Sequence, residues 1–205
     1  MFRFEKTWIN GLIVVKPFVF TDGRGMLKKS FEKQIFEENG IVLTAMEEIE
    51  TTSEQGVLRG LHLQTSRPQA KLVRVARGEL YDVAVDLRKG SETFGRWFGI
   101  RLSEENQKML YIPEGFAHGC LALRQKTTFY YLCSQRYDKE SDSGIVWNDG
   151  TLKITWPVEE AGQVILSEKD RRLGTFREFV RTYGGLGRQG EAEQYEDNFG
   201  CCTDI

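Results

Sequence analysis

The chain has 205 residues, 40% of them hydrophobic and 28% charged, and its formal net charge at pH 7 is −2. This length suffices for one well-packed core, and the near-neutral charge argues against a nucleic-acid-binding surface. No apolar stretch approaches the roughly 20 residues that span a bilayer, and the first residues, MFRFEKTWINGL, lack the pattern of a signal peptide. We therefore expect a cytoplasmic protein that binds neither nucleic acid nor membrane.

Short runs with strand character, separated by turn residues, fill most of the chain. In chain order they are Leu12–Phe20, Gly25–Ser30, Val42–Ile49, Val57–Leu63, Lys71–Ala76, Glu79–Asp86, Trp97–Leu102, Met109–Ile112, Gly119–Leu123, Thr127–Leu132 and Gly144–Trp147. Phe31–Asn39 is predicted to be a helix, with Ser30 as its cap and Gly40 as its end. Many short strands at this spacing indicate a sandwich, jelly roll or barrel.

The end of the chain differs in composition from the rest. From Gly184 onward it reads GGLGRQGEAEQYEDNFGCCTDI, which is polar and rich in glycine. We expect a single domain over residues 1–183 and a loosely held tail over residues 184–205.

Four cysteines show no CxxC spacing: Cys120, Cys133, Cys201 and Cys202. Two of them lie in apolar runs and two are adjacent near the C-terminus. This pattern supports neither a zinc site nor a disulfide framework and favours reduced thiols in a cytosolic protein.

Charged and polar residues are set into several of the apolar runs. Because side chains alternate along a strand, Lys71, His118 and Tyr131 each fall in phase with apolar neighbours. If those faces line the inside of a barrel, the three side chains converge on one cavity. Arg59 and His62 fall on opposite faces by simple alternation, and a bulge at Gly60 would turn both the same way. Taken alone, a histidine or tyrosine in such a run is more often part of the core than of a site.

Several motifs together closely resemble one family, the dTDP-4-dehydrorhamnose 3,5-epimerases. They are FTDGRG, VLRGLHLQ, PQAKLVRVARGELYDVAVDLRKGSETFG, LYIPEGFAHGCLAL, WND, ITWP and LSEKD, in order from about Pro17 to Asp170. The resemblance implies an all-β cupin fold, a double-stranded β-helix or jelly roll with a few short peripheral helices, and a homodimer. It also implies epimerisation of a nucleoside-diphosphate 4-keto-6-deoxysugar without a cofactor, in the synthesis of L-rhamnose or related deoxysugars.

The resemblance also implies roles for individual residues. His62 matches the catalytic base, Asp170 the acid that pairs with it, Tyr131 the proton donor, and Lys71 a residue near the keto oxygen of the sugar. The matched substrate-binding positions are Arg24, Lys29, Glu47, Arg59, His118, Tyr137, Asp142 and Lys169. Arg24 is expected to reach the site from the partner subunit.

Two stretches depart from the family pattern. Glu47 and Ile49 stand where glutamine and asparagine are typical, and Lys29 stands where a glutamate commonly contacts the base. Leu27 replaces an aromatic residue that can stack there. Because a reversed charge near a nucleobase changes which ligand is tolerated, we hypothesise a substrate other than the standard dTDP sugar.

Metal and cofactor sites are not expected. The only two histidines are His62 and His118, and HLQ replaces the HxH pair that metal-binding cupins use. Three alternatives stay open: a keto-sugar isomerase, a monofunctional epimerase acting on a different nucleotide sugar, and a cupin that binds nucleotide sugars without turnover.

Overall fold

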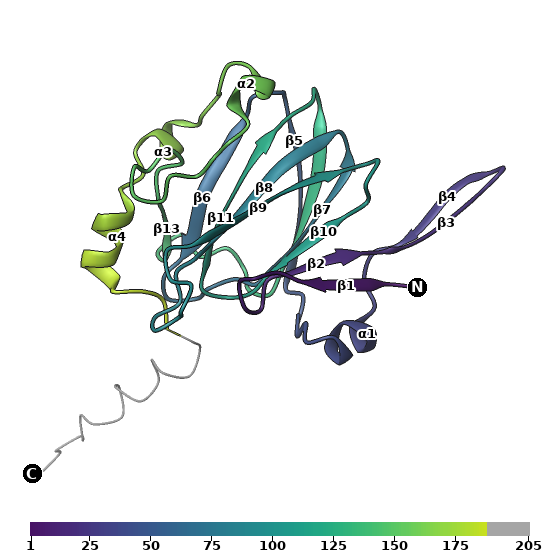
Figure 1. The fold of residues 1–205 in the computed structure, drawn as a ribbon, viewed down its shortest axis with the longest axis horizontal. Coiled ribbons are helices and arrows are strands. Elements are labelled where there is room, and N and C mark those ends of the chain that lie inside the picture. The colour runs from purple at the N-terminus through teal and green to yellow at the C-terminus, as the bar shows by residue number, and fades with distance from the viewer. Residues whose placement is uncertain (188–205) are drawn as a thin grey trace, which may run out of the picture.

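Two antiparallel β-sheets packed face to face form the body of the molecule, for which a computed structural model describes residues 1–187 (Figure 1). The six-stranded sheet has the order β1-β2-β10-β7-β12-β5, the five-stranded sheet has the order β13-β6-β11-β8-β9, and β3 and β4 form a separate hairpin. The strands are β1 Arg3–Lys6, β2 Ile13–Lys16, β3 Phe18–Asp22, β4 Gly25–Lys29, β5 Glu47–Ser53, β6 Leu58–Gln64, β7 Lys71–Arg77, β8 Glu79–Asp86, β9 Trp97–Ser103, β10 Met109–Ile112, β11 Phe116–Ala122, β12 Thr127–Cys133 and β13 Asp142–Gly144. The predicted all-β jelly roll is confirmed.

Four short helices lie at the periphery of the sheets. They are α1 Lys33–Glu38, α2 Val158–Ala161, α3 Glu168–Arg171 and α4 Phe176–Tyr183. Figure 1 shows α2, α3 and α4 along one side of the molecule, beside β6 and β13. No helix within residues 1–187 is long and apolar enough to cross a membrane.

Three apolar clusters follow from the alternation of side chains along the strands. One lies between the sheets and joins Val73 and Phe129 of one sheet to Leu80 and Leu102 of the other. A second covers the outer face of the five-stranded sheet with residues of the C-terminal helices. The third packs α1 against the outer face of the six-stranded sheet. The two sheets are therefore held from both faces, which fixes the space between them.

The N-terminal aromatic residues pack within the chain. Phe2 and Phe4 each place their ring 5.3 Å from the ring of Phe36, a fully buried residue of α1. Trp8 is different, because 60% of its surface is exposed. Phe2 and Phe4 therefore pack on α1 of their own chain.

Several predicted bounds need correction. Pro17 divides the predicted strand Leu12–Phe20 into β2 and β3, since proline cannot donate to a ladder. The predicted strand Val42–Ile49 is wrong over its first part, because β5 begins only at Glu47. Ser30 does not cap α1, whose N-cap is Glu32 without a side-chain hydrogen bond.

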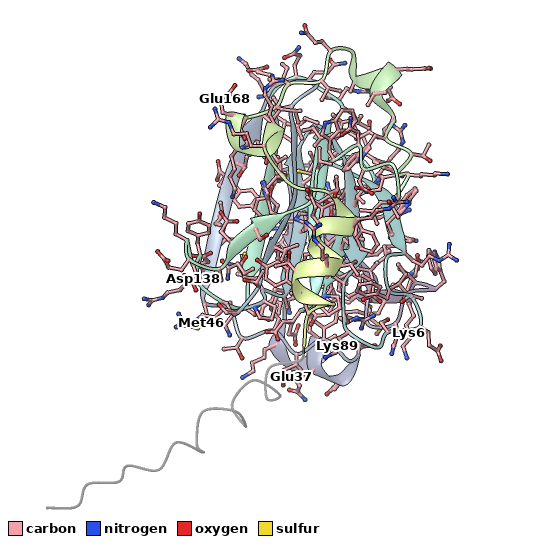
Figure 2. The ribbon with its side chains drawn as sticks, turned by 90° about the vertical axis from the view of Figure 1, so that its left-hand side faces the viewer. Lys6, Glu37, Met46, Lys89, Asp138 and Glu168 are labelled. Carbon is pink, nitrogen blue, oxygen red and sulfur yellow. The ribbon has the colours of Figure 1, made fainter. Side chains whose placement is uncertain are left out.

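The start of the predicted tail contacts the domain. Leu186 is buried, its amide donates to the carbonyl of Leu87, and its carbonyl accepts from the amide of Lys89. The predicted domain boundary at Gly184 stays a prediction, and residues 188–205 of the tail lie outside the described residues. The side-chain sticks in Figure 2 place Lys89 below the C-terminal end of α4.

Candidate active site

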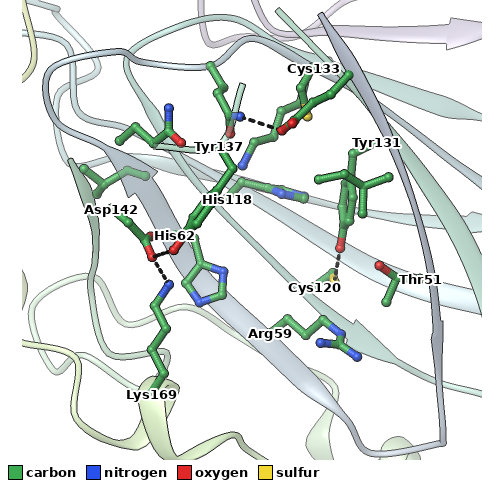
Figure 3. Close-up of a pocket in the computed structure, with 16 residues that line it drawn as sticks. Thr51, Arg59, His62, His118, Cys120, Tyr131, Cys133, Tyr137, Asp142 and Lys169 are labelled. Atoms are coloured by element: carbon green, nitrogen blue, oxygen red, sulfur yellow. Dashed lines mark hydrogen bonds and ion pairs between the residues drawn. The ribbon is translucent and has the colours of Figure 1, made fainter. Parts of the chain in front are cut away.

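A cavity of about 250 Å³ lies between the two sheets and is lined by polar side chains of both (Figure 3). Its walls come mainly from β5, β6, β7, β11 and β12, whose inward faces alternate with apolar core residues. The lining residues are Glu47, Ile49, Thr51, Arg59, His62, Leu63, Gln64, Gln69, Lys71, His118, Cys120, Tyr131, Cys133, Tyr137, Asp142 and Lys169. The predicted convergence of Lys71, His118 and Tyr131 is confirmed.

His62 lines the cavity from β6 and is held by a carboxylate behind it. Its Nε2 lies 2.5 Å from Oδ1 of Asp170, whose side chain is almost fully buried. Burial raises the pKa of Asp170, but hydrogen bonds from His62, the Ser167 hydroxyl and the Gly60 amide outweigh it, so that the pKa is lowered overall. An ionised carboxylate therefore fixes the orientation of the imidazole ring.

Helix α3 holds Asp170 in place. Ser167 is its N-cap: the hydroxyl accepts from the Asp170 amide at 3.0 Å and donates to Asp170 Oδ2 at 2.8 Å. The Ser167 hydroxyl thus caps the start of α3 and also holds the Asp170 carboxylate. The motif SEKD therefore forms a short helix whose first turn presents the acid to His62.

A bulge in β6 brings Arg59 and His62 to the same cavity. His118 of β11 pairs with His62 while Cys120 pairs with Arg59, so two residues of β6 oppose the single Gly119. Gly60 has φ +119°, and a Cβ there would lie 2.5 Å from Gly119 Cα. Only glycine fits this close approach of two strands. The predicted bulge at Gly60 is confirmed.

Lys71 lines the cavity from β7. Burial lowers the pKa of its ammonium, while nearby acidic groups, among them Cys133 and Asp82, act in the opposite direction. An ammonium in such a setting gains from an anion, because its own hydration is reduced.

A second, more deeply buried histidine–carboxylate pair lies in the cavity wall. His118 Nε2 is 2.7 Å from Oδ1 of Asp82, and both side chains are buried. Oδ2 of Asp82 has no hydrogen-bond partner within residues 1–187. Asp82 was missed from the sequence, although a single acid in the apolar run LYDVAV was a signal for it.

Tyr131 reaches the cavity from β12, in the sheet opposite to that of His62. Burial raises the pKa of its phenol well above 10, so the hydroxyl stays protonated at neutral pH. The hydroxyl lies 3.8 Å from Sγ of Cys120, and the ring packs edge-on against His118. Figure 3 shows Tyr131 and His62 on different walls of the cavity.

The rim of the cavity carries a small polar network. Asp142 Oδ2 accepts from the hydroxyl of Tyr137 at 2.8 Å and also from the ammonium of Lys169. The amide of Gln69, another lining residue, donates to Glu47 Oε1 at 3.3 Å. The predicted positions Glu47, Tyr137, Asp142 and Lys169 thus all line the cavity.

Two predicted site residues lie away from this cavity. Arg24 is at the tip of the β3–β4 hairpin, where it pairs with Asp22 at 2.6 Å and its side chain is 88% exposed. Lys29, at the end of β4, pairs with Glu32 at 2.8 Å. The hairpin extends away from the body of the molecule (Figure 1). Within one chain, therefore, neither residue reaches the others.

Two of the four cysteine thiols lie within the described residues. Cys120 and Cys133 are free and buried, as expected of reduced thiols, whereas Cys201 and Cys202 lie outside the described residues. Across residues 1–187, no group of three or more histidine, cysteine, aspartate or glutamate side chains is arranged to hold a metal ion.

Comparison with known proteins gives a consistent result. A sequence model described as dTDP-4-dehydrorhamnose 3,5-epimerase matches residues 6–178. The dTDP-4-dehydrorhamnose 3,5-epimerase of Methanothermobacter thermautotrophicus is 51% identical over 177 residues, which cover 86% of this chain and 96% of that protein.

Two solved structures are also similar. The first is the dTDP-6-deoxy-D-glucose-3,5-epimerase of Legionella pneumophila in complex with dTDP-4-keto-L-rhamnose. It has a TM-score of 0.87 and 39% identity, over 92% of this chain and 100% of that one. The second is a 3'-monoepimerase from Streptomyces bikiniensis in complex with dTDP-quinovose. It has a TM-score of 0.81 and 30% identity, over 92% of this chain and 95% of that one.

Proposed function

This chain belongs to the dTDP-4-dehydrorhamnose 3,5-epimerase family, and from that membership we propose what it acts on and how. It is an isomerase that inverts C3, C5 or both in a nucleoside-diphosphate 4-keto-6-deoxysugar of the dTDP-4-dehydro-6-deoxyglucose type, in the synthesis of L-rhamnose or a related deoxysugar. The observation that carries this function is that His62, with its carboxylate, and Tyr131 line opposite walls of one cavity that also contains Lys71.

Removal of a proton next to a ketone is the first step. The hydrogens on C3 and C5 are acidic because each resulting carbanion is an enolate with its charge on the C4 oxygen. His62 accepts the proton, and Asp170 behind it stabilises the imidazolium that forms. The ammonium of Lys71 offsets the negative charge on the enolate oxygen.

Inversion requires the new proton to arrive from the opposite face of the sugar. A single base returns its proton to the face it came from and restores the original configuration. Tyr131 meets the requirement, because its phenol lies in the opposite sheet and burial keeps it protonated. Base, oxyanion partner and acid are all side chains of this chain, so we propose a reaction that uses no cofactor.

Cationic and hydrogen-bonding groups around the cavity suit a nucleoside diphosphate. Arg59, His118 and Lys169 all line the cavity; Arg59 and Lys169 are exposed and His118 is buried. We assign these three residues to the diphosphate and sugar. The network of Tyr137 and Asp142 beside Lys169 would border the same ligand.

We further propose a homodimer in which the β3–β4 hairpin completes the partner's site. The hairpin exposes large apolar side chains, namely Phe18, Val19, Phe20, Met26 and Leu27. Exposed apolar side chains on a projecting hairpin are typical of an interface. Arg24 and Lys29 then reach a nucleotide sugar only across the interface. The cytoplasmic location stays a prediction of the sequence.

The identity of the substrate's nucleobase and sugar also stays a prediction. Glu47 and Ile49 line the cavity. The negative charge of Glu47 and the apolar side chain of Ile49 change which chemical groups of a ligand can bind beside them. Comparing turnover of dTDP-, CDP- and GDP-linked 4-keto sugars tests the altered specificity. A strong preference for the dTDP sugar removes the case for it.

Reaction in heavy water tests the function as a whole. A double epimerase incorporates deuterium at both C3 and C5 of the product, because both centres are rebuilt from solvent-exchanged protons. Deuterium at one carbon only identifies a monofunctional enzyme, the activity that the S. bikiniensis relative is named for. A product with its carbonyl at C3 identifies an isomerase that moves the ketone. Tight binding of the sugar nucleotide without any exchange identifies a non-catalytic cupin and contradicts the proposal.

A further inference from the structure

An exposed tryptophan separates two cavities that are distinct from the active site. Trp8, in the turn between β1 and β2, exposes 60% of its surface. It lines one cavity of about 540 Å³ and a second of about 560 Å³, so the two adjoin at its ring. Neither cavity shares a lining residue with the active site. We call the two together the Trp8 groove.

The walls of the Trp8 groove are partly apolar and partly cationic. Apolar atoms come from Trp97, Phe98 and Leu152, and polar atoms come from the loop 88–93. Lys89 and Arg96 are exposed there, and neither takes part in the ion pairs found within residues 1–187. Arg88 is different, because its guanidinium binds Asp86 through two hydrogen bonds of 2.6 and 2.9 Å. Two cations of the groove, Lys89 and Arg96, are therefore available to an acidic ligand, and Glu92 is the single acidic residue among the groove's lining residues.

The described part of the chain ends inside this groove. Leu186 pairs with the backbone of Leu87 and Lys89, and Gly187 lines the second cavity. The segment that follows, residues 188–205, contains five acidic residues and one arginine. It also contains two aromatic residues, of which Tyr195 is flanked by Glu193, Glu196 and Asp197. From Gly187 to Tyr195 an extended chain reaches about 26 Å, which is ample for the groove.

We propose that the Trp8 groove is the docking site of the chain's own C-terminal segment, residues 188–205. Tyr195 packs on the ring of Trp8, and the acidic residues around it pair with Lys89 and Arg96. The two surfaces are complementary in charge and in aromatic character. The match to the family's sequence model ends at residue 178, before this segment begins. Docking in the same chain is favoured because the tether keeps the segment close to the groove.

Hydrogen exchange of the full-length protein tests this proposal. Amides around Tyr195 and in the loop 88–96 should exchange at least about tenfold more slowly in the wild type than in the Lys89→Glu/Arg96→Glu double variant. Tyr195→Ser should lose the same protection. Arg77→Glu is the matched control, because Arg77 is an exposed cation at the end of β7, before β8 begins, whereas the loop 88–96 follows β8. Its reversal should leave the protection intact.

Three results would overturn docking in the same chain. The first is exchange around Tyr195 that is as fast in the wild type as in the double variant. The second is a loss of protection in Arg77→Glu equal to that in the double variant, which indicates a general effect of charge. The third is protection that disappears on about hundredfold dilution, because a tethered segment is insensitive to dilution and a second copy is not.

Discussion

At the scale of single residues, the burial of the Lys71 ammonium predicts how the activity depends on pH. Burial lowers its pKa, so the group loses its proton at a lower pH than an ordinary lysine, whose pKa is about 10.4. Because only the charged form stabilises an enolate oxygen, we expect kcat/KM to fall on the alkaline side at a pH below about 10.4.

The neighbouring thiols and phenol do not account for this alkaline fall in kcat/KM, because their pKa values are raised. Burial raises the pKa of Cys120 to about 12 and that of Cys133 to about 11, and the pKa of Tyr131 also lies well above 10. A pH–rate profile, with circular dichroism to exclude unfolding, measures the effect. Lys169→Met is the control, since it removes a rim lysine and should leave the alkaline fall in place. A flat profile up to pH 10.4 would contradict the role given to Lys71.

Prediction from the sequence succeeded for individual residues that lie within one strand. Alternation correctly indicated that Lys71, His118 and Tyr131 face one cavity. It could not reveal Asp82, whose importance depends on which strand lies beside β11. Strand neighbours are set by the whole fold, so a pair such as His118 and Asp82 becomes visible only in three dimensions.

At the scale of elements, the bulge in β6 determines where the proposed catalytic base, His62, lies. A Cβ at residue 60 would lie 2.5 Å from Gly119 Cα and 2.7 Å from the His118 carbonyl oxygen, both backbone atoms. Gly60→Ala must therefore separate β6 from β11 and move Arg59 and His62. We expect kcat/KM to fall by at least about 100-fold, because a displacement near 1 Å has costs of this size.

A glycine without such neighbours, outside both the cavity and the β3–β4 hairpin, provides the control for Gly60→Ala. Gly150 has no atom within 4 Å of an added Cβ, does not have positive φ and does not line the cavity. Gly150→Ala should therefore leave kcat/KM within about threefold of the wild-type value. Steady-state kinetics of the two variants, with thermal unfolding to verify folding, makes the comparison. Equal activity of Gly60→Ala and the wild type would show that the bulge does not position the base.

Strand prediction failed where tertiary pairing outweighs the local pattern. The segment EEIETTS reads as polar, yet it forms all of β5, because each of its residues pairs with β12. In contrast, Glu79–Asp86 and Met109–Ile112 were predicted with the bounds that the structure has. These two runs are largely buried, so their apolar character was a sufficient signal.

At the scale of the whole molecule, the β3–β4 hairpin makes the proposed dimer testable. If Arg24 acts on the partner's cavity, a heterodimer of an Arg24→Ala chain and a His62→Ala chain contains one intact site and one doubly altered site. Random mixing of the two chains should then restore about a quarter of the wild-type activity at low substrate concentration. Each variant alone should be much less active.

Co-expression of the two chains with different affinity tags allows the heterodimer to be purified and assayed. The control is a heterodimer of Lys71→Met and His62→Ala chains. Each altered residue belongs to the cavity of its own chain, so each of the two sites lacks one residue and neither is intact. If the first heterodimer is as inactive as this control, Arg24 does not act across the interface. A monomer in analytical ultracentrifugation would contradict the dimer itself.

The proposed reaction depends on two proton-transfer groups that act from opposite walls of one cavity. It is tested by incubating the Tyr131→Phe and His62→Asn variants with dTDP-4-keto-6-deoxyglucose in heavy water. Tyr131→Phe should still exchange the sugar's proton for deuterium through His62, while inversion falls by about 100-fold or more. His62→Asn should lose both exchange and inversion. Full inversion by Tyr131→Phe, or exchange that persists without His62, would contradict the roles of Tyr131 as proton donor and His62 as base.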